Sequence, residues 1–515
     1  MNRTSHTIRA ALTGAALASG LVAAGCASTP APVAKPAPAP PIAVSQPAPV
    51  AAAMPAIDSV PPTLGPAPTL KLPPIERRVL PNGMTLLVVE QHELPLADFL
   101  LVLGSGNEAD PTPRGGLASL TALLLREGTS TRTSPQIADQ LSFLGASLST
   151  GSGWDMSQVG LHTPTAQLDS ALALFADVVM RPSFPQKEVE RLKKQRLTEL
   201  LQARDRPRDI ADRVFASVLY GNVHPYGHPA TGTEESTKSI TRADVKGFYE
   251  TYYRPNNTTL IVVGDLTPDD VERRARALFG GWNRRTVPDT RYPQLASSSA
   301  APTIYLVDKP GAPQSSIRIG NIGVPRSTSD YFALQVMNTI LGGSFTSRLN
   351  QNLREKKGYT YGAGSGFSMR RQAGPFSARA EVTGTKTDSS LVEFLRELRS
   401  IRDTVSSMEL TRAKRYLQLG LPSDFETTTD IAFQLVPVVV YGLPADYYSN
   451  YVQQIENIAQ ADVQRVARQY VDPSKMSIVV VGDRASIENG LRALKVGEIS
   501  VRDMTGAIAP LSGTP

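Results

Sequence analysis

The chain has 515 residues, more than one hydrophobic core normally holds, which predicts at least two domains. Its formal net charge is +6, and two of the excess cations, Arg3 and Arg9, lie at the N-terminus. So small an excess over so long a chain, without a basic cluster, argues against a nucleic-acid-binding protein, and we expect no nucleic-acid partner.

The N-terminus has the pattern of a targeting segment. A short basic segment precedes an apolar run from Ala10 to Ala24 that is too short for a stable membrane span. The run ends in Ala-Ala-Gly-Cys26, which resembles a bacterial lipoprotein signal, so we expect residues 1–25 to be removed and Cys26 to be lipidated. The alternative is an ordinary secretory signal with an incidental cysteine. Cys26 is the only cysteine, so the chain can form no internal disulfide.

Residues 26–74 are rich in proline and alanine and nearly free of charge. Such a composition cannot bury a core and samples extended polyproline conformations. We interpret the segment as a tether that holds a soluble, periplasmic body away from a membrane, with the lipid as the only anchor. By resemblance to lipoproteins, Ala27 in place of an aspartate after the cysteine favours the outer membrane over the inner one.

Beyond the tether the apolar pattern changes to one of strands and helices. Arg77–Gln91 predicts a β-hairpin, because a Pro-Asn-Gly turn separates two strand-like runs, the second of which is apolar from Leu86 to Val89. Alternating or continuous apolar runs predict further strands at residues 97–103, 146–161 and 258–263. Helical spacing of apolar residues predicts helices at residues 115–126, 134–144, 168–180, 186–203 and 242–253.

The pattern repeats along the chain. Three short segments recur without a gap at one offset of 218 residues (458 against 240): 240–245 in 458–463, 252–255 in 470–473, and 262–265 in 480–483. Chance would rarely hold one offset across a helix, a turn and a strand, which indicates a tandem duplication. Because each copy mixes strand and helical runs, we predict an α+β fold.

The duplication sets the expected domain boundaries. The first domain covers residues 75–282 and the second covers residues 303–495. A polar stretch with proline and serine, residues 283–302, links them, and residues 496–515 form a C-terminal tail.

The run Gly116–Thr129 begins with Gly-Leu-Ala and ends with Gly-Thr. It resembles the first active-site helix of the pitrilysin/insulinase (inverted zincin) zinc peptidases, which reads GLAHxxEHxxFxGT. In that frame the two zinc-ligand histidines fall on Ser119 and Leu123, and the base glutamate falls on Ala122. A hydroxyl is a poor zinc ligand, and the other two side chains offer no ligand or base. The motif is therefore degenerate.

Further segments resemble the family in the same order along both copies. They are Tyr220–Pro229 and Tyr253–Asp265 in the first copy, and Leu341–Leu349 and Leu353–Gly362 in the second. The resemblance implies that each of the two homologous domains is an antiparallel-type sheet covered by helices, and that together they form half of a clam-shell chamber.

The family's third zinc ligand is a glutamate on the next long helix, which falls here on Glu199. A single carboxylate does not hold zinc, so we interpret Glu199 as a remnant or as an ordinary charge on a helix face. His224 and His228 are four residues apart, but a proline and a glycine between them predict a turn and not a shared helix face. We expect no metal or other cofactor in this chain. An active peptidase would need ligands that this pattern does not supply.

A second pair of residues matches the family in the later copy. There an arginine and a tyrosine seven positions apart bind the substrate backbone and the oxyanion of the tetrahedral intermediate, and Arg354 and Tyr361 have that spacing. A guanidinium and a phenol both donate hydrogen bonds suited to a developing negative oxygen. Without the resemblance, Arg354 would be interpreted as a solvated cation at a helix end and Tyr361 as a strand residue packed on the sheet.

Some members of the family are divided between a zinc-bearing subunit and a homologous sister that lacks the motif, and this sequence resembles the sister. The resemblance implies a non-catalytic, substrate-binding subunit of a heteromeric periplasmic zinc peptidase. It would supply Arg354 and Tyr361 to the zinc site of a homologous partner that bears the zinc motif, with peptides as substrates. The alternative is a peptide-binding or scaffold protein without peptidase activity.

Residues 144–157 match the region where the family presents an edge strand, to which substrate adds by β-augmentation. Serine and glycine leave the backbone of this segment accessible. The alternative is a plain edge strand whose polar residues discourage aggregation.

Overall fold

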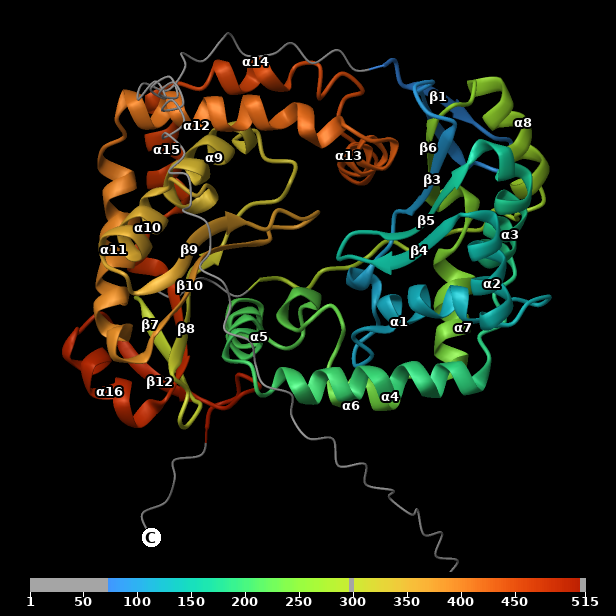
Figure 1. Cartoon of the computed structure of the whole chain (residues 1–515). Coiled ribbons are helices and arrows are strands. Elements are labelled where there is room, and N and C mark those ends of the chain that lie inside the picture. Colours follow the sequence, from blue (N-terminus) through green and yellow to red (C-terminus); the bar gives the residue numbers. More distant parts are fainter. Residues whose placement is uncertain (1–72, 296–300, 510–515) are drawn as a thin grey trace, which may run out of the picture. The chain divides into compact units, whose positions relative to one another are not determined.

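A computed structural model describes residues 73–295 and 301–509 of the chain (Figure 1). The expected signal peptide, the lipidation site Cys26 and residues 26–72 of the tether lie outside the described residues. Within these two ranges, no helix is both long and apolar enough to cross a membrane.

Two six-stranded sheets form the framework, and equivalent strands take the same positions in both. The order in the first sheet is β1-β2-β6-β3-β5-β4, with β1 (Glu76–Val79), β2 (Thr85–Glu90), β3 (Leu96–Leu103), β4 (Ser147–Ser152), β5 (Ser157–Pro164) and β6 (Thr258–Gly264). The order in the second sheet is β12-β7-β11-β8-β10-β9, with β7 (Thr303–Asp308), β8 (Gln314–Ile322), β9 (Thr360–Phe367), β10 (Pro375–Thr383), β11 (Ser477–Gly482) and β12 (Glu498–Arg502). Among these strands, β2–β6, β7–β11 and β7–β12 pair in parallel and the other neighbours are antiparallel. The α+β fold with two homologous domains is therefore confirmed.

The outermost strand beside β2 and β7 has a different origin in each sheet. In the first sheet β1 precedes β2 and pairs with it antiparallel, whereas in the second sheet β12 follows all the other elements and pairs with β7 in parallel. Residues 498–502 of the expected C-terminal tail therefore belong to the second domain, which continues past residue 495. The strand covers an edge of β7 that would otherwise expose unpaired backbone groups.

The helices follow the same duplication. In the first copy they are α1 (Leu117–Leu124), α2 (Ser134–Leu144), α3 (Leu168–Met180), α4 (Gln186–Ala203), α5 (Pro207–Tyr220), α6 (Glu234–Ser239), α7 (Arg242–Tyr252) and α8 (Pro268–Phe279). In the second copy they are α9 (Tyr331–Asn338), α10 (Arg348–Asn350), α11 (Thr387–Asp403), α12 (Ser407–Gly420), α13 (Thr428–Tyr441), α14 (Tyr451–Glu456), α15 (Gln460–Tyr470) and α16 (Arg484–Ala493).

The bounds of α3 and α4 are those predicted, but the single strand expected at residues 146–161 is two strands. The backbone N–H of Gly153 donates to the carbonyl of Met156 at 2.8 Å and closes a turn between β4 and β5. Apolar and polar residues alternate on both sides of this turn. The periodicity therefore predicted one long strand and gave no sign of the turn.

One face of each sheet is covered by helices of its own copy. In the first copy Leu86, Phe99 and Leu101 of the sheet share a core with residues of α1, α3, α7 and α8. In the second copy β7, β8 and β10 share a core with α9, α11 and α15. These two cores correspond to the apolar helix faces that sequence periodicity predicts.

The opposite face of each sheet is covered by a helix from the other copy (Figure 1). Val214 and Phe215 of α5, in the first copy, pack against the second sheet beside β8 and β11. Leu435 and Val436 of α13, in the second copy, pack against the first sheet beside β3 and β6. Since α5 and α13 occupy equivalent places in the duplication, the two copies exchange one helix each.

This exchange explains why the central strands are continuous apolar runs. Consecutive strand residues point to opposite faces, and in β2 the residues Leu86, Leu87, Val88 and Val89 are all buried. A strand with both faces covered has no solvent side on which polar residues would be favoured.

Polar contacts fix both ends of α13 to the first copy. At its start, the hydroxyls of Thr428 and Thr429 donate to the carboxylate of Asp98 at 2.6 and 2.9 Å. At its end, the hydroxyl of Tyr441 donates to Oδ2 of Asp155 at 3.0 Å. Because Asp98 and Asp155 are both buried, these hydrogen bonds are better shielded from water than surface contacts.

We expect the Leu435→Ala substitution to lower the free energy of unfolding by about 2–5 kcal/mol, because it removes apolar contacts and leaves a cavity between α13 and the first sheet. Hydrogen exchange should speed up in β3 and β6, which belong to the other copy. The matched control is Leu201→Ala, since Leu201 is 58% exposed. Faster exchange confined to the second copy would contradict the exchange of helices.

Candidate functional site

The helix that carries the degenerate zinc motif, α1, is held firmly at its N-terminus. The carboxylate of Asp110 accepts from the backbone N–H groups of Gly116 and Ala118, both at 2.7 Å. Gly116 has φ +90°, and a Cβ at this position would collide with the carbonyl of Thr231. Only glycine fits there without strain. The start of the helix thus keeps the conformation that the motif requires, although the zinc ligands of the motif are absent.

None of the three replaced positions can serve a zinc ion. The hydroxyl of Ser119 donates to the carbonyl of Gly116 at 3.0 Å and lies 3.4 Å from the carbonyl of Ala230. Ala122 is fully buried, whereas Leu123 is 37% exposed. A hydroxyl already used in this way, a methyl group and an isobutyl group provide neither a zinc ligand nor a base.

The helix of the third ligand position, α4, packs against α1. Arg196 on α4 donates from Nη1 to the carbonyl of Gly116 at 2.7 Å and ties the two helices together. Glu199 follows on the same helix, is exposed, and accepts from Gln195 at 2.9 Å. Within the described residues, no group of three His, Cys, Asp or Glu side chains is placed to hold a metal ion. A zinc ion does not fit these residues.

His224 and His228 flank a short 3₁₀ turn, Pro225–Gly227, as predicted. Nδ1 of His224 accepts from the backbone N–H of Tyr226 at 3.0 Å, so this ring organises the turn. Burial lowers the pKa of His224 to about 4, and the positive charges of Arg370 and His228 act in the same direction. Both histidines are part of the loop that packs beside α1 and α4.

Arg354 and Tyr361 lie on neighbouring elements of the second copy. Arg354 is on a π-helical turn, Gln351–Lys356, with its guanidinium 4.7 Å from the ring of Phe345 and Nε 3.3 Å from the carboxylate of Glu355. Tyr361 is on β9, and its side chain is 90% exposed. The tyrosine is therefore not packed on the sheet.

A β-bulge lies opposite Tyr361. The pairing of β9 with β10 shifts register between Ala380 and Val382, opposite Tyr361. The hydroxyl of Thr360 donates to the carbonyl of Glu381 at 2.6 Å and stabilises the bulge. Bulges redirect side chains next to functional sites in many sheets.

The segment at residues 144–157 contains β4, which occupies the outermost position of the first sheet. It is therefore an edge strand, and the equivalent position in the second sheet is occupied by β9, which carries Tyr361. Both strands have an unpaired backbone edge within the described residues, the geometry that β-augmentation requires.

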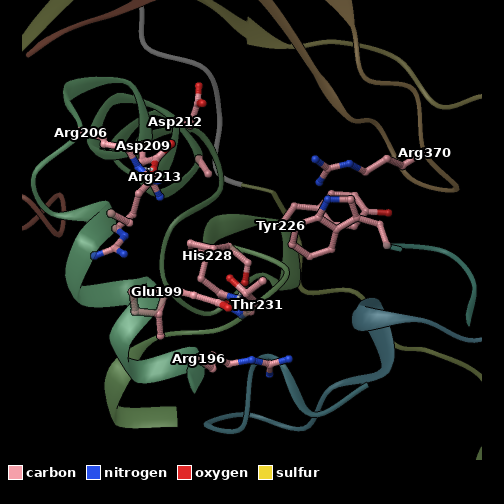
Figure 2. A pocket seen from close by; sticks show the side chains of 15 residues that line it. Arg196, Glu199, Arg206, Asp209, Asp212, Arg213, Tyr226, His228, Thr231 and Arg370 are labelled. Carbon is pink, nitrogen blue, oxygen red and sulfur yellow. Dashed lines mark hydrogen bonds and ion pairs between the residues drawn. The ribbon is translucent and has the colours of Figure 1, made fainter. Parts of the chain in front are cut away.

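A cavity of about 430 Å³ beside Glu199 was not predicted from the sequence (Figure 2). It is formed by α4, α5, the loop from Tyr226 to Thr231 and the loop between β9 and β10. Its lining residues are Trp154, Arg196, Glu199, Leu200, Ala203, Arg206, Asp209, Asp212, Arg213, Ala216, Tyr226, His228, Pro229, Thr231 and Arg370. The volume lies in the range of small-ligand sites.

The second copy contributes Arg370 to this cavity, and the next residue, Arg371, holds its loop in place. The backbone N–H of Arg371 donates to Oδ2 of Asp155 at 2.8 Å and fixes the β9–β10 loop on the first copy. The guanidinium of Arg370 then lies 4.4 Å from the ring of Trp154 and 4.3 Å from the ring of Tyr226. Trp154 lay in the segment singled out as an edge strand, but nothing in the sequence around Arg370 indicated this contact.

Residues 86–230 match the family described as insulinase (peptidase family M16), and residues 239–417 match the peptidase M16 inactive domain. A solved structure from Pseudomonas fluorescens, described as a peptidase M16 inactive domain, is 30% identical to this chain. The similarity covers 79% of this chain and 98% of that one, with a TM-score of 0.74. The chain therefore belongs to the insulinase (M16) peptidase family, as its motifs indicated.

Relatives within the family differ in their names. A Mycobacterium leprae protein named an uncharacterized zinc protease is 26% identical over 430 residues, which cover 82% of this chain and 94% of that protein. A Helicobacter pylori protein named a non-peptidase homolog is 23% identical over 399 residues, covering 77% of this chain and 91% of that protein. A solved protease structure from Helicobacter pylori, 21% identical with a TM-score of 0.74, covers 80% of this chain and all of its own, and it supports the fold alone.

We expect the purified chain to retain only substoichiometric zinc after dialysis against a zinc-containing buffer, because one carboxylate does not make a zinc site. Elemental analysis measures this directly. The Glu199→Gln variant should retain the same trace amount. One zinc per chain, lost in this variant, would contradict the placement of the residues around α1.

We expect acid to destabilise the protein partly through His224. Its pKa is lowered from an unfolded value of about 6.5 to about 4, so below pH 6.5 the unfolded chain binds a proton that the folded chain does not. Stability present above that pH is lost as the pH falls toward 4. Urea unfolding at neutral and acidic pH should show a smaller loss for His224→Asn than for the unmodified chain.

His92 provides a control of opposite sign, because hydrogen bonds to Asp265 and Glu90 raise its pKa. Its contribution is present below the unfolded pKa and is lost as the pH rises, so His92→Asn should be more harmful in acid than at neutral pH. Parallel pH profiles of the two variants would contradict both assignments.

Proposed function

We propose that this protein is a non-catalytic, substrate-binding subunit of a heteromeric zinc peptidase. In this role it supplies Arg354 and Tyr361 to the zinc site of a homologous partner. The observation that carries the proposal is the contrast between the two halves of the site. The zinc positions hold Ser119, Ala122 and Leu123, which supply neither a ligand nor a base, whereas Arg354 is partly exposed and Tyr361 is 90% exposed.

The exposure of Tyr361 supports a role outside the fold. Its hydroxyl forms no hydrogen bond with any described residue, and its ring is 90% exposed. A large aromatic side chain held there on a bulged edge strand contributes little to the core. Together with the guanidinium of Arg354, it offers hydrogen-bond donors to the oxyanion of a peptide undergoing hydrolysis.

The partner would provide what this chain lacks. A zinc ion held by the partner's own ligands would activate a water and would polarise the scissile carbonyl. The names of the relatives agree with such a division, since proteins named as zinc proteases and as a non-peptidase homolog both align with most of this chain.

The proposed location is the periplasm, with an anchor in the outer membrane. Support comes from the sequence pattern alone, namely the basic and apolar residues 1–25, the cysteine at position 26, and the proline- and alanine-rich tether after it. The tether would let the body reach a partner and peptides at some distance from the membrane.

A second candidate is a peptide-binding or scaffold protein without peptidase activity. The open edge of β4 favours it, since peptide can add to an edge strand in the absence of any catalytic group. In that case Arg354 and Tyr361 would have no effect on hydrolysis, because no partner would be present.

The test is peptide cleavage by the chain alone and together with a homologous subunit that bears the zinc motif. We expect no cleavage by the chain alone, and cleavage by the pair that chelators abolish. Arg354→Ala combined with Tyr361→Phe should lower kcat of the pair by roughly 10²–10³-fold, the effect of losing oxyanion donors.

Matched controls are Arg273→Ala and Tyr416→Phe, which remove the same groups from exposed helix positions. They should leave kcat unchanged. Chelator-sensitive activity of the single chain, or full activity of the pair with the double variant, would refute the proposal.

A further inference from the structure

The cavity beside Glu199 contains a largely buried cation, Arg370, that has no ion-pair partner within the described residues. Nε and Nη1 of Arg370 are buried and have no hydrogen-bond partner, and its guanidinium forms no ion pair within the described residues. A buried charge is normally paired, because removing an unpaired charge from water is costly. Burial also lowers the pKa of Arg370, although the nearby Asp155 carboxylate acts in the opposite direction.

Aromatic rings hold the guanidinium in position but do not neutralise it. The rings of Trp154 and Tyr226 are 5.2 Å apart and nearly perpendicular, and Arg370 lies against both. These cation–π contacts involve the flat faces of the guanidinium. The N–H groups in its plane still need oxygen acceptors. The hydroxyl of Tyr226 is engaged with Asp155 at 3.1 Å. The guanidinium end of Arg370 points into the cavity (Figure 2).

Two carboxylates of the lining are already occupied by other arginines. Asp209 pairs with Arg206 on the same helix. Asp212 pairs with Arg318 of the second sheet at 2.6 Å. Neither carboxylate is therefore free to compensate the cation on the other side of the cavity.

The remaining charges leave the cavity positive. Arg213 forms no ion pair within the described residues, and Figure 2 shows it on the side of the cavity opposite Arg370. Burial lowers the pKa of His228, so this ring is neutral at neutral pH. The lining contains four arginines and three carboxylates, a net charge of one positive unit. A ligand with one negative charge therefore matches the cavity better than a phosphate with two.

The walls between the charges are apolar. Leu200, Ala203, Ala216 and Pro229 line the cavity together with Trp154. A ligand that fits must therefore combine a planar monoanion for the guanidinium with an adjacent apolar group. The last residue of a peptide with a free carboxylate and an apolar side chain has both features in one unit.

We propose that this cavity binds the free C-terminal carboxylate of a peptide, with Arg370 as the partner of the carboxylate and the last side chain against Trp154. The inference rests on the proposed function in one respect, namely that peptides reach this chain. It requires no zinc and no partner subunit, because every group involved belongs to this chain.

The experiment is calorimetry on the whole chain with an N-acetylated hexapeptide that has no charged side chain and ends in leucine, as the free acid and as the C-terminal amide. We expect the acid to bind about tenfold or more tightly than the amide, since a charge-assisted hydrogen bond is lost in the amide. Trp154 and Trp282 are the two tryptophans, so in the Trp282→Phe variant the fluorescence of Trp154 reports occupancy of the cavity.

Arg370→Gln should weaken binding of the acid about tenfold or more and leave the amide unaffected, and Arg370→Lys should restore part of the loss. Arg273→Gln, on an exposed helix face, is the matched control. Ala216→Trp fills the cavity from α5 without touching Arg370, and it should abolish binding even if the arginine variants fold poorly.

Equal affinity for acid and amide, or unchanged binding by Arg370→Gln, would overturn the proposal. Binding of N-acetyl-leucine without binding of the hexapeptide would also overturn it, since the site would then select a small free acid. The binding assay contains no partner and the cleavage assay depends on Arg354 and Tyr361, so each proposal can fail while the other stands.

Discussion

The structure depends on the burial of both faces of each central sheet. Helices of one copy cover a single face, and the apolar residues of the other face, such as Leu87 and Val89, need a helix from elsewhere. In the duplicated chain each copy provides this helix to the other, so α5 of the first copy covers the second sheet and α13 of the second copy covers the first sheet. The apolar surface buried in this way holds the two copies together. The segment that links them carries no secondary structure in its described part, and none is needed.

That constraint also positions the functional elements. The β9–β10 loop reaches the first copy beside the end of α13, where Asp155 accepts hydrogen bonds from Tyr441, Tyr226 and the backbone of Arg371. One buried carboxylate thus joins three segments that are far apart in the sequence. The cavity forms beside it, against α4 and Glu199. The degenerate zinc helix α1 is kept nearby as a packing element, with Asp110 at its start and Arg196 bound to its first carbonyl.

Much of the fold could be predicted because it is encoded locally. The bounds of α3 and α4 followed from helical periodicity, and the hairpin of β1 and β2 followed from its turn residues. The exchange could not be predicted, because the apolar face of α5 indicates that the helix is buried but not which sheet covers it. The replaced positions Ser119, Ala122 and Leu123 were identified from the frame of the motif. Arg370 was not identified, because its contact with Trp154 is created by tertiary structure alone.

The exchange of helices has a consequence for the covalent continuity of the chain. Cleavage within residues 283–302 would leave each fragment with a helix that the other needs, so the fragments would remain bound as a two-chain particle. Gel filtration after such cleavage would show one species, whereas a simple tandem array would separate. Each copy thus completes the covering of the other copy's sheet, in the manner of two subunits that exchange a helix.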